Sequence, residues 1–392
     1  MSMDASARNA PRLPRALLVS SFVLPRSGGI EQFVDIATRL LRGHGWRVRV
    51  LACRPRAGGA EADATVPTRY LGGGGWPLPV GGLRTLWREV GEADVVVANG
   101  TRHLLPNAAA FTARLRGKRV VFVLHGSGAS FSTSSFFYHR VLGSLFERLL
   151  SRPALRLSRP VSLSRAGVVG CRNRYGVEAT YVPFPLRQLP PPSPTPLASD
   201  EPLKIVWAGR LYGEKNPLAA VAVVDRVRQQ RPATLDVYGS GPLLDELEQL
   251  ARDRPWLNVC GPRNWAEIQQ AQGAAHVCLS TSLRDATQMA VLEPLARGVP
   301  VVSTRVGDAL GYYARGLWPF CVEAGDPEAA AEAVLTLATT YDRHRKRFAA
   351  NAHELLRRHR EGARRLAELL EPETPATRNG LPASSRAELP VT

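Results

Sequence analysis

Short runs of aliphatic residues alternate along the chain with longer stretches in which apolar residues recur every three or four positions. The short runs are typical of buried parallel strands and the longer stretches of amphipathic helices, so their order predicts repeated βαβ units. The strands predicted in the first half are Ala16–Ser20, Arg47–Ala52, Asp94–Ala98, Arg119–Leu124, Val161–Leu163, Gly167–Gly170 and Ala179–Val182. Those predicted in the second half are Lys204–Ala208, Thr234–Tyr238, Leu257–Cys260, His276–Ser280, Pro300–Ser303 and Pro319–Val322. The helices predicted between them include Glu31–Arg42, Pro217–Arg231, Pro242–Arg254 and Met289–Arg297.

A proline-rich segment divides this pattern into halves of similar size. Eight prolines lie between Val182 and Leu203, and because they restrict the backbone they predict a semi-rigid connector. The sequence therefore predicts an α/β protein of two doubly wound parallel-sheet domains. Ligands of such sheets bind outside the carboxyl ends of the strands, so the cleft between the halves is the expected active site. The predicted segments are 1–15 (disordered), 16–185 (first domain), 186–202 (linker), 203–345 (second domain), 346–370 (C-terminal helical segment) and 371–392 (disordered).

Composition excludes several classes of protein. Hydrophobic residues make up 44% and charged residues 22% of the 392 positions, as in ordinary globular proteins. No apolar run approaches the roughly 18 residues that span a bilayer, and the N-terminus lacks the apolar core of a signal peptide. The five cysteines include no C-x-x-C pair, so neither a disulfide framework nor a zinc site is expected. We expect a cytoplasmic protein that needs no metal or cofactor.

The net charge of +17 is carried entirely by residues 1–195, since basic and acidic residues balance in the remainder. This asymmetry predicts that the first half meets an anionic partner, such as a membrane surface, an acidic acceptor or a nucleic acid. A nucleic-acid-binding protein would show basic residues interleaved with aromatic residues or a known motif, and the sequence has neither. That function is therefore the less favoured alternative.

Four glycine-containing turns follow predicted strands. Gly28–Gly29 precedes the helix predicted from Glu31. His125–Gly126 directly follows the predicted strand Arg119–Leu124, at the expected cleft. Paired glycines allow close approach of a ligand to the backbone, although a plain turn explains them about as well. In the second half, Gly209–Arg210 follows the predicted strand Lys204–Ala208, and Lys215 lies five residues further on. Gly239–Ser240–Gly241 follows the next predicted strand, Thr234–Tyr238. A guanidinium and an ammonium at one strand end suit a diphosphate.

The segment 280–303 is the most specific part of the sequence. Asp285 and Glu293 lie eight residues apart, the first in a predicted loop and the second within a predicted helix. The amides at the start of that helix are suited to an anion or sugar hydroxyls, and a carboxylate inside it can accept from paired ribose hydroxyls.

With these motifs in order, the chain resembles the family 4 retaining glycosyltransferases, which have the GT-B fold of two facing Rossmann-like domains. The resemblance covers roughly residues 16–345. The matching pieces are Gly28–Gly29–Ile30–Glu31, Arg42–Gly43–His44–Gly45–Trp46, His125–Gly126, Ser164, Gly209–Arg210, Glu214–Lys215–Asn216, Gly239–Ser240–Gly241–Pro242, the segment 285–293 and Gly298–Val299–Pro300–Val301–Val302.

The resemblance implies an acceptor-binding first domain and a donor-binding second domain. The implied catalytic residues are His125, Arg210 and Lys215, of which the two cations hold the donor diphosphate. Donor contacts are implied for Gly29, Gly209, Gly239, Gly241, Asp285, Ala286, Thr287, Gln288, Met289 and Glu293, with Glu293 on the ribose. Acceptor contacts are implied for Gly28 and Glu31. Two departures stand out: Asp285 replaces the family's usual Glu, and the segment 307–311 lacks a usual downstream Glu.

These features predict a metal-independent, retaining transfer of a sugar from a UDP- or GDP-sugar to a hydroxyl group. A sugar-nucleotide epimerase on the same architecture is the alternative enzyme. Residues 135–152 are predicted as one amphipathic helix whose apolar stripe is Tyr138, Val141, Leu142, Leu145, Phe146 and Leu149. Such a helix more often packs on its own sheet, but eight arginines against one acidic residue between Arg140 and Arg174 favour an anionic membrane. Peripheral membrane attachment and a lipid-linked acceptor are thus expected, with a soluble natural-product acceptor as the alternative.

Overall fold

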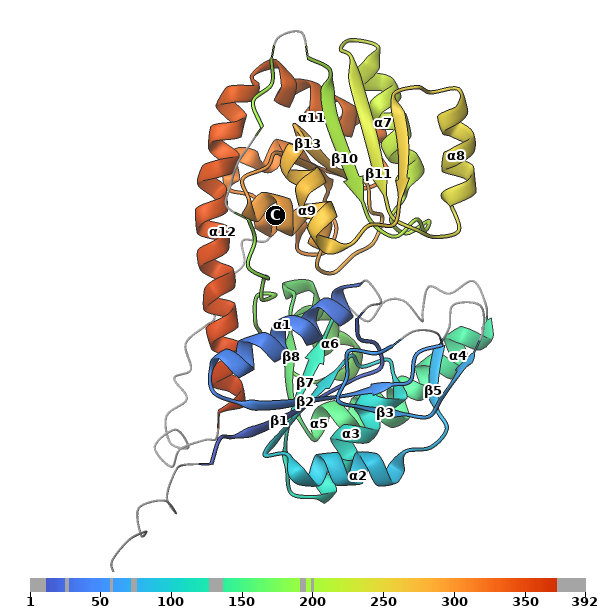
Figure 1. Cartoon of the computed structure of the whole chain (residues 1–392), viewed down its shortest axis with the longest axis vertical. Coiled ribbons are helices and arrows are strands. Elements are labelled where there is room, and N and C mark those ends of the chain that lie inside the picture. Colours follow the sequence, from blue (N-terminus) through green and yellow to red (C-terminus); the bar gives the residue numbers. More distant parts are fainter. Residues whose placement is uncertain are drawn as a thin grey trace, which may run out of the picture.

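The computed structural model describes residues 12–24, 28–56, 59–71, 76–126, 137–190, 195–198 and 201–371. In these residues two parallel sheets face one another, each covered by helices (Figure 1). The first sheet has the strand order β3-β2-β1-β6-β7-β8-β9. Its strands are β1 (Arg15–Ser20), β2 (Arg47–Cys53), β3 (Ala64–Val66), β6 (Val95–Asn99), β7 (Arg119–Leu124), β8 (Arg159–Ser162) and β9 (Thr180–Tyr181).

The second sheet has the order β12-β11-β10-β13-β14-β15. Its strands are β10 (Leu203–Ala208), β11 (Ala233–Tyr238), β12 (Leu257–Gly261), β13 (Val277–Ser280), β14 (Val301–Thr304) and β15 (Cys321–Val322). Every pair of neighbours in both sheets is parallel. The chain reverses direction across each sheet where β1 lies beside β6 and β10 beside β13, which are the switch points at which ligands of such sheets bind. The expected doubly wound α/β class is confirmed.

Helices cover both faces of each sheet, because the strands are apolar along their length and both faces must be shielded from water. Central strands such as β6 and β13 are buried along their whole length, as expected for parallel strands covered on both faces. In the first domain the helices are α1 (Gly29–Gly43), α2 (Leu83–Glu92), α3 (Leu104–Leu115), α4 (Phe137–Phe146), α5 (Arg152–Arg156) and α6 (Arg165–Tyr175), with the π-helical turn η2 (Glu147–Ser151) joining α4 to α5. The first domain also contains a separate antiparallel hairpin of β4 (Thr68–Leu71) and β5 (Trp76–Pro79).

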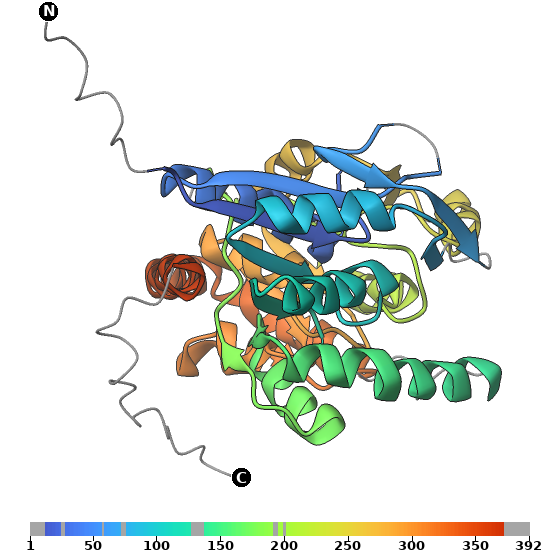
Figure 2. The same ribbon diagram turned by 90° about the horizontal axis from the view of Figure 1, so that it is seen from below.

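In the second domain the helices are α7 (Pro217–Arg228), α8 (Leu244–Arg252), α9 (Trp265–Ala274), α10 (Met289–Ala296) and α11 (Pro327–Thr339), with short 3-10 turns η3 (Ala309–Tyr312) and η4 (Arg315–Phe320). The last helix, α12 (Tyr341–Leu370), runs from the second domain back along the first (Figures 1 and 2). Arg119 of β7 donates to the carbonyls at its end, and Gly362 lies against Pro183 so closely that a Cβ would approach the Pro183 carbonyl oxygen to 2.6 Å. The helix therefore packs against both domains.

One predicted strand is wrong, and another is predicted too long. Gly167–Gly170 lies inside α6, where the Ser164 side chain accepts from the Gly167 amide at 2.9 Å. Ser164 caps the N-terminus of this helix, and the helix includes a short apolar run that by itself has the pattern of a strand. Residues 319–320 belong to η4, which leaves only two residues in β15. The termini expected to be disordered lie outside the described residues except for 12–15 and 371, and residues 135–136 of the predicted helix 135–152 also lie outside them.

Candidate active site

The loop after β10 carries the first of two cations expected to bind the diphosphate. Gly209 and Arg210 follow the last residue of the strand directly. The Arg210 side chain is half exposed (53%), lies over the ring of Tyr212 and pairs with Glu214 at 2.6 Å. Exposed ion pairs contribute about 0–1 kcal/mol to stability, so the guanidinium can exchange Glu214 for a bound anion at little energetic cost.

Lys215 is less exposed and contacts the other predicted donor segment. Its ammonium pairs with the carboxylate of Asp285, in the loop after β13, and the two side chains are 17% and 20% exposed. Burial raises the pKa of Asp285, and the Lys215 charge opposes that shift. The backbone beside Lys215 is fixed because Thr281 donates to the carbonyl of Asn216 at 2.7 Å. The groups predicted to bind diphosphate and sugar therefore lie in direct contact.

Gly239 and Gly241 are required by the packing of two loops. Their φ angles are 148° and 154°. A Cβ on Gly239 would lie 1.8 Å from the carbonyl oxygen of Gly209, and one on Gly241 would lie 2.5 Å from that of Leu211. These glycines thus let the loop after β11 lie against the backbone that carries Arg210, which is a structural reason for residues that the resemblance assigns to the donor.

Gly239→Ala is therefore expected to lower the free energy of unfolding by about 3 kcal/mol or more, through backbone strain and steric overlap. The thermal unfolding midpoint would show this loss. Gly213→Ala is the matched control, because no atom lies within 4 Å of a Cβ there. Equal midpoints for the two variants would contradict the packing argument.

The side chain of Gln288 anchors the loop 285–289. It is 1% exposed, its Oε1 accepts from Ser280 at 2.9 Å, and its Nε2 donates to the carbonyls of Thr304 and Val306, both at 3.1 Å. Only the backbone of Gln288 remains for the predicted donor contact. The side chains of Thr287 and Met289 are partly exposed at the start of α10.

The same loop contacts the first domain. A Cβ built on Gly126 would lie 4.0 Å from the Cβ of Ala286, so the end of β7 and the donor loop meet at the cleft. Nearby, both carboxylate oxygens of Asp308 accept backbone N–H groups of α6, from Arg165 at 2.7 Å and from Ala166 at 3.0 Å. The two domains are thus joined by hydrogen bonds beside the predicted site.

His125 is a neutral, half-buried hydrogen-bonding group. Its Nε2 contacts Oδ1 of Asn99, whose amide nitrogen donates to Ser20 at 3.2 Å and to the carbonyl of Ile30 at 3.3 Å. Because Asn99 Oδ1 can only accept, Nε2 of His125 carries the proton and Nδ1 remains an acceptor. Burial lowers the pKa of His125 to about 3, so at neutral pH this imidazole cannot supply a proton as a cationic acid.

Gly28 and Gly29 begin α1 but differ in their surroundings. A Cβ on Gly28 would lie 2.5 Å from Oε2 of Glu31, whose side chain is 4% exposed and lies against this turn. No atom of the described residues lies within 4 Å of a Cβ built on Gly29, and its backbone needs no glycine. Gly29 is therefore free to approach a ligand, whereas Glu31, predicted to contact the acceptor, packs on its own helix start.

Glu293 lies one turn into α10 and is held by α9. Its Oε1 accepts from the indole nitrogen of Trp265 at 3.1 Å, and its Oε2 accepts from Gln269 at 2.9 Å. Burial raises the pKa of Glu293 to about 7 in spite of these donors. Neither Trp265 nor Gln269 was expected from the sequence. The signal that could have identified them is the Asn264-x-x-Glu267 capping box, which starts α9 directly after β12 at the cleft edge.

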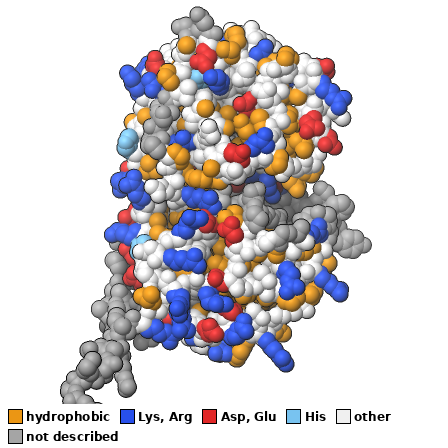
Figure 3. Space-filling view, viewed as in Figure 1, with side chains coloured by type: hydrophobic (Ala, Val, Ile, Leu, Met, Phe, Trp, Pro, Cys, Tyr) orange, Lys and Arg blue, Asp and Glu red, His pale blue; other side chains and the backbone are white. Residues whose placement is uncertain are grey.

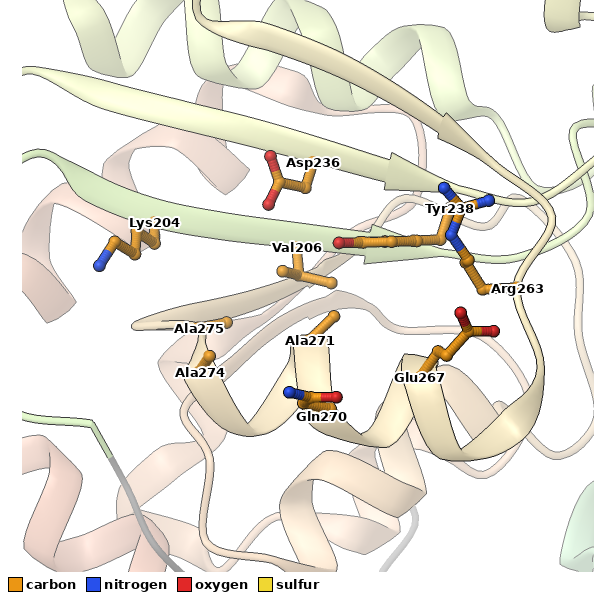
Figure 4. A pocket seen from close by; sticks show the side chains of 10 residues that line it. All are labelled: Lys204, Val206, Asp236, Tyr238, Arg263, Glu267, Gln270, Ala271, Ala274 and Ala275. Atoms are coloured by element: carbon orange, nitrogen blue, oxygen red, sulfur yellow. The ribbon is translucent and has the colours of Figure 1, made fainter.

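A separate cavity of about 380 Å³ lies between α9 and the face of the second sheet (Figure 4). It is lined by Lys204, Val206, Asp236, Tyr238, Arg263, Glu267, Gln270, Ala271, Ala274 and Ala275. No residue predicted to act in catalysis or in donor or acceptor binding lines it. Among the described residues, no group of three or more His, Cys, Asp or Glu side chains is placed to hold a metal ion.

Solved structures of the same architecture include a protein bound to UDP-glucose and a sucrose-phosphate synthase. The Anabaena protein HepE, solved in complex with UDP-glucose, superposes with a TM-score of 0.66 at 17% identity, over 91% of this chain and 99% of that one. Sucrose-phosphate synthase from Thermosynechococcus elongatus gives 0.70 at 16% identity, over 91% and 98%. These likenesses confirm the GT-B fold.

Two curated relatives match shorter stretches. The Arabidopsis thaliana sulfoquinovosyl transferase SQD2 is 29% identical over 36% of this chain and 28% of its own length. One subunit of the human phosphatidylinositol N-acetylglucosaminyltransferase is 27% identical over 29% of this chain and 25% of its own length. The chain thus matches about a quarter of the length of these relatives. The models "Glycosyltransferase Family 4" and "Glycosyl transferases group 1" match residues 27–183 and 202–340, and the chain therefore belongs to the family 4-like glycosyltransferases.

Proposed function

We propose that the protein transfers a sugar from a nucleotide-diphosphate sugar to a hydroxyl acceptor, with retention of the anomeric configuration. The observation that carries this is the position of Arg210 and Lys215 on one loop, with Lys215 in contact with Asp285 of the donor loop. In the proposed complex, the diphosphate replaces Glu214 and Asp285 as the partner of these two cations. UDP-glucose bound to HepE, a protein of the same fold, supports this class of donor.

In the proposed reaction, the bond between the sugar anomeric carbon and the diphosphate oxygen breaks, and the electron pair leaves with the nucleoside diphosphate. Arg210, Lys215 and the N-terminal amides of α10 stabilise the charge that develops on the leaving oxygen. The acceptor hydroxyl attacks from the same face and gives its proton to the departing phosphate. No step requires a metal ion or a protein nucleophile. His125 contributes neutral hydrogen bonds beside the sugar.

The stereochemical claim can be tested without knowing the acceptor, because transferases commonly pass sugar slowly to water. Proton NMR of UDP-glucose, UDP-N-acetylglucosamine and GDP-mannose with the protein in EDTA would show which anomer of the free sugar forms first. The donor's own anomer is expected. Formation of the opposite anomer would refute retention, and conversion to another nucleotide-bound sugar would favour the epimerase.

For the acceptor, we propose a lipid-linked hydroxyl compound reached at an anionic membrane surface. Val141, Leu142, Leu145 and Leu149 lie along α4 and η2 and are 48–63% exposed. They form the apolar stripe of the helix, and its opposite side holds buried Glu147, which pairs with Arg174 at 2.5 Å. No described helix is long and apolar enough to cross a bilayer.

Exposed basic residues also occur in this part of the chain. Arg148, Arg156 and Arg159 are exposed, and Lys and Arg side chains spread over the lower, first domain in Figure 3. Each such residue near an anionic leaflet contributes about 1 kcal/mol to binding. One relative named above belongs to a phosphatidylinositol N-acetylglucosaminyltransferase, which supports a lipid acceptor.

Leu142→Glu is expected to reduce co-flotation with phosphatidylglycerol-containing vesicles at least fivefold at low salt, because the charge opposes insertion of the stripe. Leu13→Glu is a matched control, since Leu13 is 60% and Leu142 63% exposed, and Leu13 lies two residues before β1 and outside α4. If the wild-type protein ignored anionic vesicles at low salt, the membrane proposal would be wrong and a soluble acceptor preferred.

A further inference from the structure

Glu293 is the centre of a chain of contacts that crosses from one domain to the other. Its two carboxylate oxygens accept from Trp265 and Gln269 of α9, as described above. Gln269 is fixed in turn, because its backbone carbonyl accepts from the Arg297 guanidinium at the end of α10. The donors that hold Glu293 are therefore themselves held.

Trp265 is clamped by the connector between the domains. The guanidinium of Arg187 lies over its indole, 5.2 Å from the ring centroid. The same guanidinium pairs at 2.7 Å with Asp35 of α1, in the first domain, and the Arg187 side chain is only 19% exposed. Cation–π stacking of a desolvated Arg on Trp is among the stronger contacts of its kind. The indole N–H thus points at Glu293 from a fixed plane.

The carboxylate keeps capacity for a ligand. Two carboxylate oxygens offer about four lone-pair positions, of which two are occupied by protein donors. The remaining two match the paired hydroxyl groups of a ribose. Each ribose hydroxyl donates a hydrogen bond, so the ionised carboxylate, which only accepts, is the form that binds. Arg187 and Arg297, the charged groups that face Glu293, both favour that form, and burial disfavours it.

We propose that Trp265, clamped under Arg187, is a positioning residue that fixes the Glu293 carboxylate so that it can accept both ribose hydroxyls of the donor. This inference rests on the proposed function, in which Glu293 binds the ribose. It adds residues of α9 and of the interdomain connector to the determinants of nucleotide affinity, and it connects the ribose site to α1 of the first domain.

The test is the pH dependence of nucleotide binding by Trp265→Phe, which keeps an aromatic ring under Arg187 and removes one N–H. Calorimetry from pH 6 to 8.5 would compare UDP or GDP, whichever the wild-type chain binds, with its 2′,3′-dideoxy analogue. The analogue corrects for titration of the phosphates. Loss of one donor should raise the pKa of Glu293 by about one unit. The diphosphate should then bind about fivefold more weakly at pH 7, with most of the affinity regained at pH 8.5.

Two further variants guard against a trivial effect. Arg187→Met removes the clamp and its charge but keeps the indole N–H, and it should shift the pH profile in the same direction. Trp256→Phe is the matched control: Trp256 also stacks with an arginine, Arg228, at 5.4 Å, but it does not contact Glu293. Its profile should equal that of the wild type. The dideoxy analogue should respond to none of the three variants.

An unchanged profile for Trp265→Phe would overturn the inference, and so would equal weakening of the diphosphate and its dideoxy analogue, since that indicates a merely structural role. Glu293→Gln separates this failure from failure of the proposed function. If Glu293→Gln weakens the diphosphate and spares the analogue, the ribose assignment stands without Trp265. If Glu293→Gln does not distinguish the two nucleotides, the ribose assignment itself is wrong.

Discussion

Replacement of Lys215 by Ala is expected to lower turnover by about 100- to 1000-fold, the loss typical when one donor to a developing oxyanion is removed. Lys215 and Arg210 are the cations that follow β10, and Lys215 already lies against an anion, the carboxylate of Asp285. The measurement is the rate of donor consumption at saturating donor, which separates the loss in kcat from the weaker donor binding that the variant should also show.

Stability must be controlled in this experiment, because Lys215→Ala leaves a largely buried carboxylate without its partner. The double variant Lys215→Ala/Asp285→Asn removes that unpaired charge and should be at least as slow as the single variant while unfolding at a higher temperature. Lys204→Ala is the surface control, since Lys204 is half exposed and pairs with Glu201 at 2.6 Å. Turnover by Lys215→Ala within a few fold of the wild type would refute the assignment of Lys215 to the donor diphosphate.

Glu293→Gln is expected to weaken binding of the sugar-free nucleoside diphosphate by about 10- to 100-fold. The variant loses hydrogen bonds to a charged acceptor, each contributing roughly 1.5–3 kcal/mol. In addition, the new amide group would face either Trp265 or Gln269, both of which donate. Calorimetry at pH 8 measures the loss, and Glu248→Gln on the exposed face of α8 is the control.

Asp285→Asn should behave differently. Asp285 contacts Lys215 and the Ala286 amide, so its loss frees Lys215 for the diphosphate while removing a group expected to bind the sugar. Affinity for the sugar-free diphosphate should stay within about threefold of the wild type, and turnover of the sugar-bearing donor should fall. Equal loss of diphosphate affinity in the Asp285 and Glu293 variants would contradict this division of roles.

Much of the fold could be predicted because parallel strands buried on both faces carry a direct sequence signal. Runs such as Arg119–Leu124 and Lys204–Ala208 are apolar, short and followed by glycine or another turn residue, and both are strands. The run at Gly167–Gly170 has similar composition but forms a helix, because the Ser164 cap three residues earlier decides its conformation. The π-helical turn between α4 and α5 has no comparable local signal.

The candidate site could be predicted from the sequence only where its residues belong to a single motif after a single strand. Arg210 and Lys215 are close in the sequence, and their loop was identified directly. The contact of Lys215 with Asp285 joins residues 70 positions apart, and that of Glu293 with Trp265 joins residues 28 apart. Such contacts depend on how loops of different strands meet. The pairing of Asp308 with the start of α6 depends further on how two domains meet, which no periodicity encodes.

The most direct test of the central claim is the thermal unfolding midpoint of the full chain in EDTA, with and without UDP, GDP and their sugar conjugates, for the wild type and Lys215→Ala. A ligand that binds only the folded protein adds about 2.7 kcal/mol of stability at a hundredfold excess over its Kd, which corresponds to a rise of several degrees. We predict such a rise for the wild type with one nucleoside diphosphate and its sugar conjugates, and a much smaller one for Lys215→Ala. Absence of any rise in the wild type, or an equal rise in the variant, would contradict the account.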